Sequence, residues 1–266
     1  RKEIIGKNNV VVLSPEDQVV TKGGPKERRF FFDRLFSIVN INYLKTLQEY
    51  NRVLKQRNAL LSIANKNQAK ETSFLLWDEK LSISAIKLWG FRKNSFLIFQ
   101  KILNEVIINY QEGLSLDVVY LEKTPKKEEY QSQLEKTRDR DIFLGTTSIG
   151  PHRDKIDFFW SKKNLRDYGS QGEHKISLVL LKLAEISLIK KTTGNNPTLL
   201  LDDVFAKLDL DRSKKLVSYL SLIESKARES IQTIITTTDI VNLKQTGLTL
   251  KNKNIKSYKL EPDCNT

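Results

Sequence analysis

The sequence contains no methionine among its 266 residues and only one cysteine, Cys264. A single cysteine excludes a disulfide framework or a zinc cluster built within the chain, and it favours a reducing compartment. No apolar run reaches the roughly 18 residues of a membrane span, and the stretch Arg1 to Lys7 lacks a signal-peptide core. We therefore expect a cytoplasmic protein with no membrane partner. Because an intact reading frame begins with methionine, we also expect a fragment without its natural start, with proteolytic maturation as the alternative.

Acidic residues are in deficit. The chain has 45 Lys and Arg against 32 Asp and Glu, a net charge of +13 and a pI near 9.6. This surplus favours a polyanionic partner, nucleic acid first and an anionic membrane second. The basic residues are spread along the chain, so pairs such as Lys162-Lys163 are more typical of a solvated face than of a contact. The length allows one large domain or two small ones.

Proline and glycine are almost missing from one long region. Between Lys26 and Gln111 there is no proline and one glycine, Gly90. Apolar residues recur there at helical spacing, as in Leu44, Leu47 and Leu54. We predict about three long helices, which form an insertion that stands apart from the sheet.

Short apolar or β-branched runs elsewhere predict strands. The charged segment 122–140 is expected to be an exposed loop or a polar helix. We expect a helix capped by Asp209 or Asp211 to reach about Ile223. The expected strands cover residues 9–13, 114–121, 143–149, 155–160, 199–201 and 231–238.

The segment 199–209 carries the strongest chemical signal. Three leucines, Leu199 to Leu201, are typical of a strand buried on both faces of a parallel sheet. Asp202 and Asp203 follow at the carboxyl end, where open α/β sheets bind ligands. One carboxylate there can hold Mg²⁺ and the next can orient an attacking water, as in a Walker B strand. The alternative is a core strand that ends in a turn with two aspartates.

A helix start lies about thirty residues upstream. Tyr168-Gly169-Ser170-Gln171-Gly172-Glu173-His174-Lys175 precedes an apolar stretch from Ile176 to Ile189. Helix N-terminal N–H groups and small residues suit an anion, although the same pattern also fits an ordinary Ser-capped core helix. Together the two segments resemble the signature loop and Walker B strand of ABC-type ATPases. Gln171 and Glu173 depart from that family's Ser-Gly-Gly-Gln loop.

Further blocks, in order along almost the whole chain, are similar to the RecF family of bacterial DNA replication and repair ATPases. The Gly-Pro-His-Arg block and those around Pro25–Asp33 and Gln56–Asn58 are more specific to this family than the signature loop or Walker B. The matching blocks are Leu13-Ser14-Pro15-Glu16-Asp17, Lys22 to Asp33, Leu54 to Leu61, Trp77-Asp78, Gly150-Pro151-His152-Arg153, the Ser170 loop and Leu201-Asp202-Asp203.

The resemblance implies a fold and a function. The fold class would be α/β, an ABC-type ATPase head with an incomplete P-loop NTPase-like sheet and an inserted helical lobe. Residues 1–25 would end the N-terminal ATPase lobe, 26–112 form the helical lobe, and 113–266 the C-terminal part of the head. Such proteins bind ATP, Mg²⁺ and DNA, form ATP-dependent homodimers, and act with RecR and RecO in recombinase loading, recombinational repair and the SOS response.

The resemblance also assigns roles to residues. Asp202 would bind Mg²⁺, and Asp203 would be the catalytic carboxylate. Ser170, Gln171, Gly172 and Glu173 would form the loop that meets the γ-phosphate of ATP held by the other subunit. Lys207-Leu208-Asp209 matches the D-loop at the dimer interface. Thr238 lies near the place where transporters carry a switch histidine, which this chain lacks.

One family motif is missing. Residues 1–266 contain no P-loop of the form Gly-x-x-x-x-Gly-Lys-[Ser/Thr], and Gly23-Gly24-Pro25-Lys26 is too short for one. In the family this loop lies ahead of the matched region. We therefore expect a weak ATPase in the full-length protein and an inactive fragment. The alternatives are a non-catalytic basic DNA-binding module and another ABC-type ATPase, of the chromosome-maintenance type.

Several residues remain open between two roles. The only histidines, His152 and His174, are more typical of structural hydrogen-bonding groups than of catalysts. Arg153 pairs either with a phosphate or with a buried carboxylate. Arg28 and Arg29 either brace the helical lobe, which is favoured, or touch DNA. The tryptophans Trp77, Trp89 and Trp160 are expected to be packing residues.

Overall fold

The computed structural model of the chain describes residues 9–64, 71–111, 113–121, 124–207, 209–225, 232–238, 240–246, 248 and 256–258. The lone cysteine at position 264 and the D-loop residue Leu208 lie outside them. Within this part of the chain, every helix falls short of the combined length and apolarity that a bilayer crossing requires.

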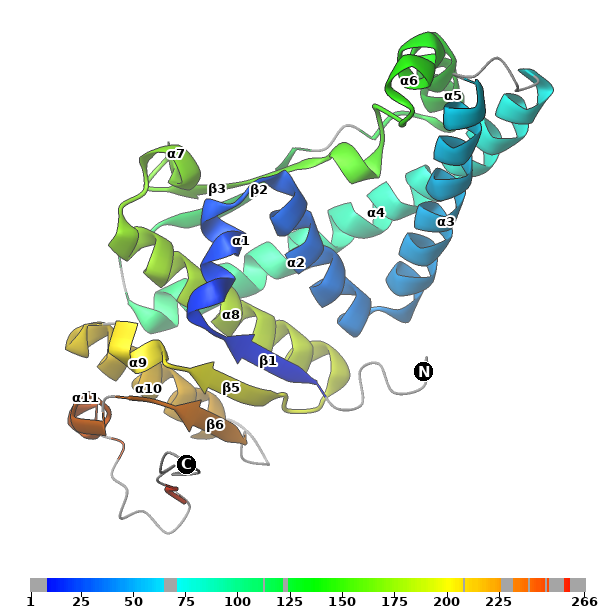
Figure 1. Cartoon of the computed structure of the whole chain (residues 1–266). Coiled ribbons are helices and arrows are strands. Elements are labelled where there is room, and N and C mark those ends of the chain that lie inside the picture. The colour runs from blue at the N-terminus through cyan, green and yellow to red at the C-terminus, as the bar shows by residue number, and fades with distance from the viewer. Residues whose placement is uncertain are drawn as a thin grey trace, which may run out of the picture.

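A parallel sheet of three strands forms one end of the molecule (Figure 1). Its order is β1 (Val10–Leu13), β5 (Thr198–Asp202) and β6 (Thr233–Thr236), so the leucine-rich strand is central. The register pairs Leu201 with Leu13 and with Ile235. The predicted parallel sheet is confirmed. Its burial is less complete than expected, because Leu199 and Leu201 are fully buried whereas Leu200 is half-buried.

Helix α8 (Gln171–Thr193) lies against this sheet and forms the centre of the molecule. All positions from Ile176 to Ile189 except Ser187 are buried. A helix can be apolar around its whole circumference only when neighbours cover every side. Here β1 packs on α8 from one side, and α1 (Val19–Lys22), α2 and α4 pack on it from others.

The predicted region of long helices is confirmed. It contains α2 (Pro25–Val39), α3 (Ile41–Ala64) and α4 (Glu71–Tyr110), and α3 packs along α4. Figure 1 shows α3 and the distal half of α4 leading away from the parallel sheet, toward α5 (Lys127–Lys136) and α6 (Arg138–Leu144). Buried side chains of these helices and of the sheet form one continuous cluster. The domain boundaries at 25/26 and 112/113 remain predictions.

A second, antiparallel sheet was not foreseen. It contains β2 (Leu116–Leu121), β3 (Lys155–Trp160) and the short β4 (Lys163–Asn164), in that order. Helices α2 and α4 contact this sheet. Phe32 of α2 packs between them, since its ring contacts Phe99 of α4 and Phe158 of β3.

The strand expected over residues 143–149 is wrong. Phe143 and Leu144 end helix α6, and Gly145 closes it in the left-handed conformation with φ 64°. Phe143 is 81% and Leu144 48% exposed, so the apolar residues at the start of this run are not covered by a sheet. Buried Asp141 instead anchors the helix and the loop after it.

The remaining elements are short connections and helices beyond the sheets. They are the 3₁₀ turns η1 (Pro15–Gln18) and η2 (Pro151–Arg153), and the helices α7 (Leu165–Tyr168), α9 (Val204–Lys207), α10 (Leu210–Ser225) and α11 (Ile240–Gln245). Asp209 precedes α10 and its carboxylate accepts the Arg212 N–H, which agrees with the predicted cap.

Candidate functional site: the carboxyl edge of the sheet and the start of helix α8

The two aspartates after β5 lie beside the end of β6. Asp202 is exposed and pairs in register with Thr236, whose hydroxyl donates to Asp202 Oδ1 at 2.5 Å. Parallel strands end at the same edge of a sheet, and this places the threonine-rich end of β6 next to the carboxylates. The structure thus holds Asp202 at the sheet edge by a hydroxyl that sequence reasoning had not singled out.

Asp203 leaves the strand in the left-handed conformation, with φ 49°. Its N–H donates to the carbonyl oxygen of Thr236 at 3.1 Å and to its hydroxyl at 3.2 Å. Aspartate is one of the few residues that tolerates this conformation, and such backbone outliers cluster at functional sites. The hydroxyl of Thr238 donates to Asp203 Oδ1 at 3.2 Å. Thr238, expected near a switch position, therefore contacts the candidate catalytic carboxylate.

The predicted loop before α8 forms a capping box. The Ser170 hydroxyl accepts the Glu173 N–H at 3.3 Å, and Glu173 Oε2 accepts the Ser170 N–H at 2.7 Å. The Gln171 side-chain oxygen accepts a hydrogen bond from Lys22 at 2.9 Å. Glu173, a departure from the ABC signature, thus caps the helix. The remaining N–H groups of the first turn have no intrahelical acceptors, and Lys22 adds positive charge beside them.

Arg212 connects the start of α8 to the start of α10. Its guanidinium pairs with Asp209 at 3.1 Å and lies 3.1 Å from where a Cβ on Gly172 would be. A side chain at position 172 would push this guanidinium away, so the position of Arg212 explains why a glycine stands here. The structure therefore brings Gly172 and Asp209 together through an arginine that sequence reasoning missed. Only the spacing of Arg212, three residues after a capping aspartate, offered a signal.

His174 has a structural environment. It is buried, and its Nδ1 has no hydrogen-bond partner among the described residues. Burial, with smaller contributions from Lys22 and Arg28, lowers the pKa of His174 below its ordinary value. Its Nε2 lies 3.1 Å from where a Cβ on Gly169 would be. The neutral ring thus packs under the loop that precedes α8, and this favours the structural alternative.

The candidate residues thus form two groups with different partners. The aspartates at positions 202 and 203 bond threonines at the β6 end. At the α8 start, Gln171 bonds Lys22 and Gly172 lies beside Arg212, which itself pairs with Asp209. The described residues contain no cluster of three or more metal-ligating side chains. A Mg²⁺ ion at a nucleotide site needs only one or two carboxylates, because phosphates and waters complete its shell.

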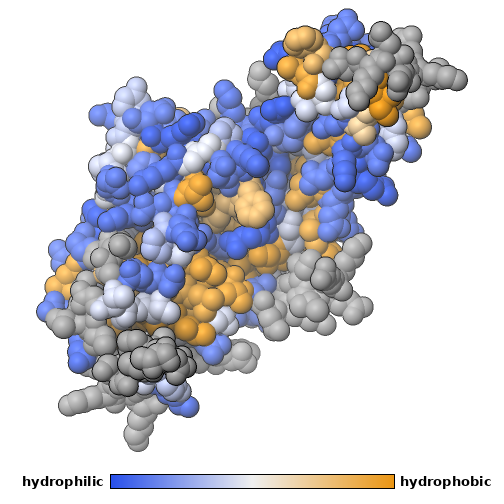
Figure 2. Space-filling view, viewed as in Figure 1, coloured by the Kyte–Doolittle hydropathy of each residue, from blue (hydrophilic) through white to orange (hydrophobic). Residues whose placement is uncertain are grey.

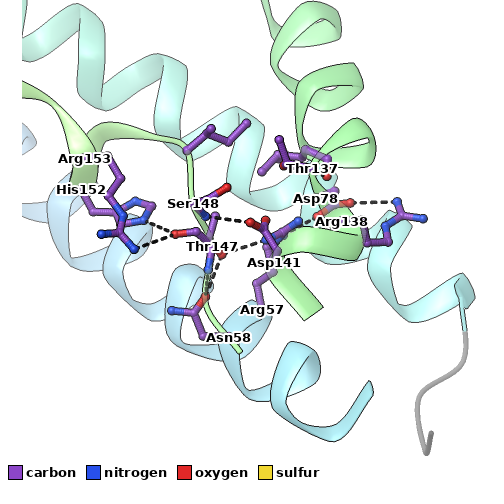
Figure 3. Close-up of polar contacts among 12 residues, drawn as sticks. Arg57, Asn58, Asp78, Thr137, Arg138, Asp141, Thr147, Ser148, His152 and Arg153 are labelled. Carbon is purple, nitrogen blue, oxygen red and sulfur yellow. Dashed lines mark hydrogen bonds and ion pairs between the residues drawn. The ribbon is translucent and has the colours of Figure 1, made fainter. Parts of the chain in front are cut away.

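Two of the blocks that are most specific to the resemblance, Gln56–Asn58 and Gly-Pro-His-Arg, meet in a buried polar network (Figure 3). The fully buried guanidinium of Arg57 donates to Asp78 at 2.6 Å, to Asp141 at 2.8 Å and to the Thr147 hydroxyl at 2.8 Å. Asn58 Oδ1 accepts both the N–H and the hydroxyl of Thr147, at 2.9 and 2.7 Å. These blocks therefore hold α3, α4 and the loop after α6 together, far along the chain from the sheet-edge carboxylates.

The Gly-Pro-His-Arg block extends this network. The carbonyl of Thr147 accepts from His152 Nε2 at 2.9 Å and from Arg153 at 3.4 Å, and His152 Nδ1 accepts the Tyr50 hydroxyl at 2.6 Å. Burial lowers the pKa of His152 from 6.5 to about 4, with neighbouring cations adding to the effect. A neutral imidazole with both nitrogens bonded is a structural histidine. Arg153 is exposed and donates to a carbonyl oxygen, neither to a carboxylate nor to a phosphate.

The two arginines of the α2 start differ. Arg28 is buried and donates to Asp157 at 2.8 Å and to the carbonyl of Ile156 at 3.0 Å, so it braces β3 against α2. Arg29 is half-buried and donates to the carbonyl of Asp154 at 2.7 Å. Trp89 is a packing residue with a polar contact as well, since its indole N–H donates to Asp154.

Comparison with known proteins gives relatives and similar structures, while no family model matches the chain. The chain is 39% identical over 243 residues to the DNA replication and repair protein RecF of Lachnoclostridium phytofermentans, covering 90% of the chain and 64% of the relative. It is 38% identical over 250 residues to RecF of Streptococcus pyogenes serotype M1, covering 91% and 66%. The chain therefore spans slightly less than two thirds of these relatives.

Solved structures agree with this similarity. A structure of the recombination mediator protein RecF-ATPrS in the RecFOR pathway superposes with a TM-score of 0.78 and 27% identity, over 90% of this chain and 65% of that one. A RecF-ATP structure from the same pathway gives a TM-score of 0.77 and 29% identity, over 90% and 64%. The α/β fold with an ABC-type head and a helical part is thereby confirmed.

Proposed function

Because the chain belongs to the RecF family of DNA replication and repair proteins, we propose that the full-length protein binds ATP and DNA and supports recombinase loading. The DNA would be single-stranded or gapped as well as duplex, and the setting recombinational repair and the SOS response in the cytoplasm. The RecFOR name of the pathway of the similar structures supports RecR and RecO as partners. The net charge of +13 suits a DNA partner.

The observation that carries the ATP assignment is the pair of aspartates at the carboxyl edge of the parallel sheet. Asp202 is the proposed Mg²⁺ ligand, directly or through water. Its Oδ1 accepts the Thr236 hydroxyl, which fixes the carboxylate so that its second oxygen can face the ion. When bound, Mg²⁺ would neutralise charge on the nucleotide phosphates.

Asp203 is the proposed catalytic carboxylate. Its backbone is fixed by Thr236 and its Oδ1 by Thr238, and both contacts limit where the carboxylate can hold a water. A carboxylate within hydrogen-bond reach of that water can accept its proton. Aspartate is one methylene shorter than glutamate, so the water is held at greater distance and turnover is slow.

The start of α8 is proposed to meet the γ-phosphate of ATP bound to the opposite subunit. The Ser170 cap, the exposed first turn and the nearby cations Lys22 and Arg212 form a setting for an anion. Asp209, held by Arg212, would then lie at the interface between subunits. Residues 1–266 contain no P-loop, so the activity is proposed for the full-length protein and not for this stretch alone.

Two variants of the full-length protein test the assignment. Ser170→Arg should block ATP-dependent dimerisation and leave ATP binding largely intact, because a long cation would fill the space of the γ-phosphate. Asp203→Asn should keep ATP-dependent dimerisation and slow hydrolysis by about 10²-fold or more, because only the proton acceptor is lost. Sedimentation with ATP, a nucleotide-binding titration and phosphate release separate these effects.

Ser170→Ala is the matched control for the arginine variant. It removes the cap, at a cost of about 1 kcal/mol, without filling the space, so dimerisation should persist. If Ser170→Arg dimerises normally with ATP, the segment is a capped core helix and the signature assignment fails. If the full-length protein binds DNA but shows no ATP binding, the non-catalytic DNA-binding module is the correct function.

A further inference from the structure

A cavity of about 660 Å³ borders helix α2, and its lining includes none of the candidate ATP-site residues. We call it the α2 groove. It is lined by residues of η1, α1, α2, α3, α4, η2 and α8, with five cationic side chains against three carboxylates. Its volume is in the range that encloses a ligand of nucleotide size. The cations are Lys26, Arg29, Arg34, Arg92 and Lys182, and the carboxylates are Asp17, Glu27 and Asp33.

Most charges in the groove are already paired. Arg92 binds Asp33 through a bidentate contact, and Lys182 lies 3.4 Å from Asp17. Arg34 donates to buried Glu185 of α8 at 2.6 Å. These pairs belong to the architecture of the walls and leave little charge for a ligand.

Arg29 is different. Its guanidinium is half-buried and, among the described residues, bonds one acceptor, the carbonyl of Asp154, and no carboxylate within ion-pair distance. Burial lowers the pKa of Arg29 below its ordinary value; the neighbouring cations Arg92 and Arg153 add to the effect, and the carboxylates of Asp154 and Asp33 oppose it in part. A partly desolvated cation beside other cations is stabilised by an anion, and a guanidinium binds a phosphate by two parallel hydrogen bonds.

An exposed aromatic ring lines the same groove as this cation. Phe30 lines the groove and is 71% exposed, whereas its neighbours Phe31 and Phe32 are buried in the core. Figure 2 shows apolar side chains over α1 and α2 surrounded by hydrophilic ones. A large ring left in water next to a cation offers a face on which a base can stack. The exposed amide of Asn51, from α3, also lines the groove and can bond a base edge.

We propose that the α2 groove binds an unpaired nucleotide, with its phosphate on Arg29 and its base stacked on Phe30. The same chemistry is offered by a single DNA strand and by a free mononucleotide, and the open groove along α2 favours the strand. In that form the inference rests on the proposed DNA function and gives it a site for unpaired bases. Duplex DNA keeps its bases stacked inside the helix and cannot use Phe30 in this way.

The test measures binding of a short fluorescent oligothymidylate to the full-length protein, by anisotropy, with and without ATP. Phe30→Ala should weaken binding about 5- to 100-fold, the range found for losing one base–aromatic stack. Phe30→Trp should restore binding, and base stacking should quench the added indole. Because Phe30 is exposed, neither variant should disturb folding, which thermal unfolding checks. Phe143→Ala, at another exposed ring, on α6, is the matched control and should bind like the unmodified protein.

Arg29→Gln tests the phosphate contact. It should weaken binding and reduce the slope of log K against log salt by about one unit. Arg140→Gln, at an exposed arginine on α6, is the matched control and should bind the oligothymidylate like the unmodified protein. If Phe30→Ala and Arg29→Gln both bind the oligothymidylate like the unmodified protein, the proposal is overturned. An equal loss on blunt duplex DNA with Phe30→Ala also overturns it, because stacking on an unpaired base is then not the cause.

A titration with thymidine monophosphate separates this site from the proposed DNA function. If the unmodified protein binds no DNA even at low salt, the DNA function fails. Phe30-dependent binding of the mononucleotide would then still support the groove as a nucleotide site. Mononucleotide binding that is indifferent to Phe30, together with no DNA binding, would overturn the groove as well.

Discussion

Arg57 shows at the residue scale what one buried cation can hold together. Its guanidinium joins Asp78 of α4, Asp141 of α6 and Thr147 of the loop beyond, while its own backbone belongs to α3. Removing one partner of a buried ion pair leaves an uncompensated charge, which costs more than the pair itself contributes. The block around Arg57, which is specific to the family, therefore contributes to the stability of the fold.

We expect Arg57→Ala to lower the free energy of unfolding by about 3–5 kcal/mol, because buried Asp141 loses its cation and Asp78 keeps only its pair with Arg138. Urea denaturation at neutral pH measures this. Arg57→Lys should recover only part of the loss, since an ammonium cannot reproduce the planar fork. The exposed Arg140→Ala is the control and should change stability by less than about 0.5 kcal/mol. A similar small change for Arg57→Ala would contradict a structural role.

His152 gives a pH dependence of stability. Its folded-state pKa of about 4 lies below the ordinary 6.5, so the unfolded chain binds the extra proton more readily. The stabilisation is complete above pH 6.5 and is lost as the pH falls from 6.5 to 4. At 1.36 kcal/mol per pKa unit, the loss is about 3 kcal/mol.

The measurement is urea denaturation of the unmodified protein and of His152→Gln across that pH window. The glutamine variant should show the smaller decrease in stability, because it carries no proton-binding ring at this position. Carboxylates and His174 titrate in both proteins, so the difference between the two curves isolates His152. Parallel curves from pH 6.5 to pH 4 would refute the assignment.

At the scale of elements, the turn into η2 depends on a glycine. Gly150 has φ 133° and ψ 178°, and a Cβ there would lie 2.5 Å from the Tyr130 hydroxyl and 2.7 Å from the Tyr50 hydroxyl. Both tyrosines are buried, with 1% exposure, so neither ring can move aside cheaply. This turn also positions the His152 ring so that its Nε2 bonds the Thr147 carbonyl oxygen.

We expect Gly150→Ala to destabilise the protein by about 3 kcal/mol, from backbone strain together with the clash. Gly90→Ala is the matched control, because Gly90 lies inside α4 with nothing within 4 Å of a Cβ. Alanine there should be neutral or stabilise by up to about 1 kcal/mol through helix propensity. Thermal unfolding of the two variants distinguishes them, and equal effects would show that the turn geometry is unimportant.

At the scale of the whole molecule, the net charge of +13 is the feature from which we expect a salt dependence of the proposed DNA binding. Lysines and arginines that neutralise phosphates release condensed counterions, and log K then falls linearly with log salt.

We expect DNA binding by the full-length protein to weaken about 10³-fold or more between about 50 and 200 mM salt, if it neutralises six phosphates. Anisotropy titrations at several salt concentrations with ATP present give the slope. Binding that is undetectable at low salt would contradict the DNA assignment, and salt-independent binding would show that the charge surplus is not used.

Local patterns in the sequence determined much of this protein. The leucine run of β5, the glycine-poor helical region and the cap at Ser170 all follow from interactions within a few residues, so each was predictable. The aspartates after β5 were placed correctly at the carboxyl edge of a parallel sheet. The run 143–149 misled, because apolarity alone does not state whether another element covers it, and Phe143 is exposed.

Contacts between distant segments were decided only by the tertiary structure. Thr236 on Asp202 depends on the register of β5 and β6, and Arg212 beside Gly172 depends on how α10 packs near α8. The same holds for Arg28 and Arg29, which are adjacent in sequence and point to different surroundings because a helix turns by about 100° per residue. One-dimensional periodicity records which face of an element is apolar. It does not record which element covers that face, and that pairing gives each polar side chain its partner.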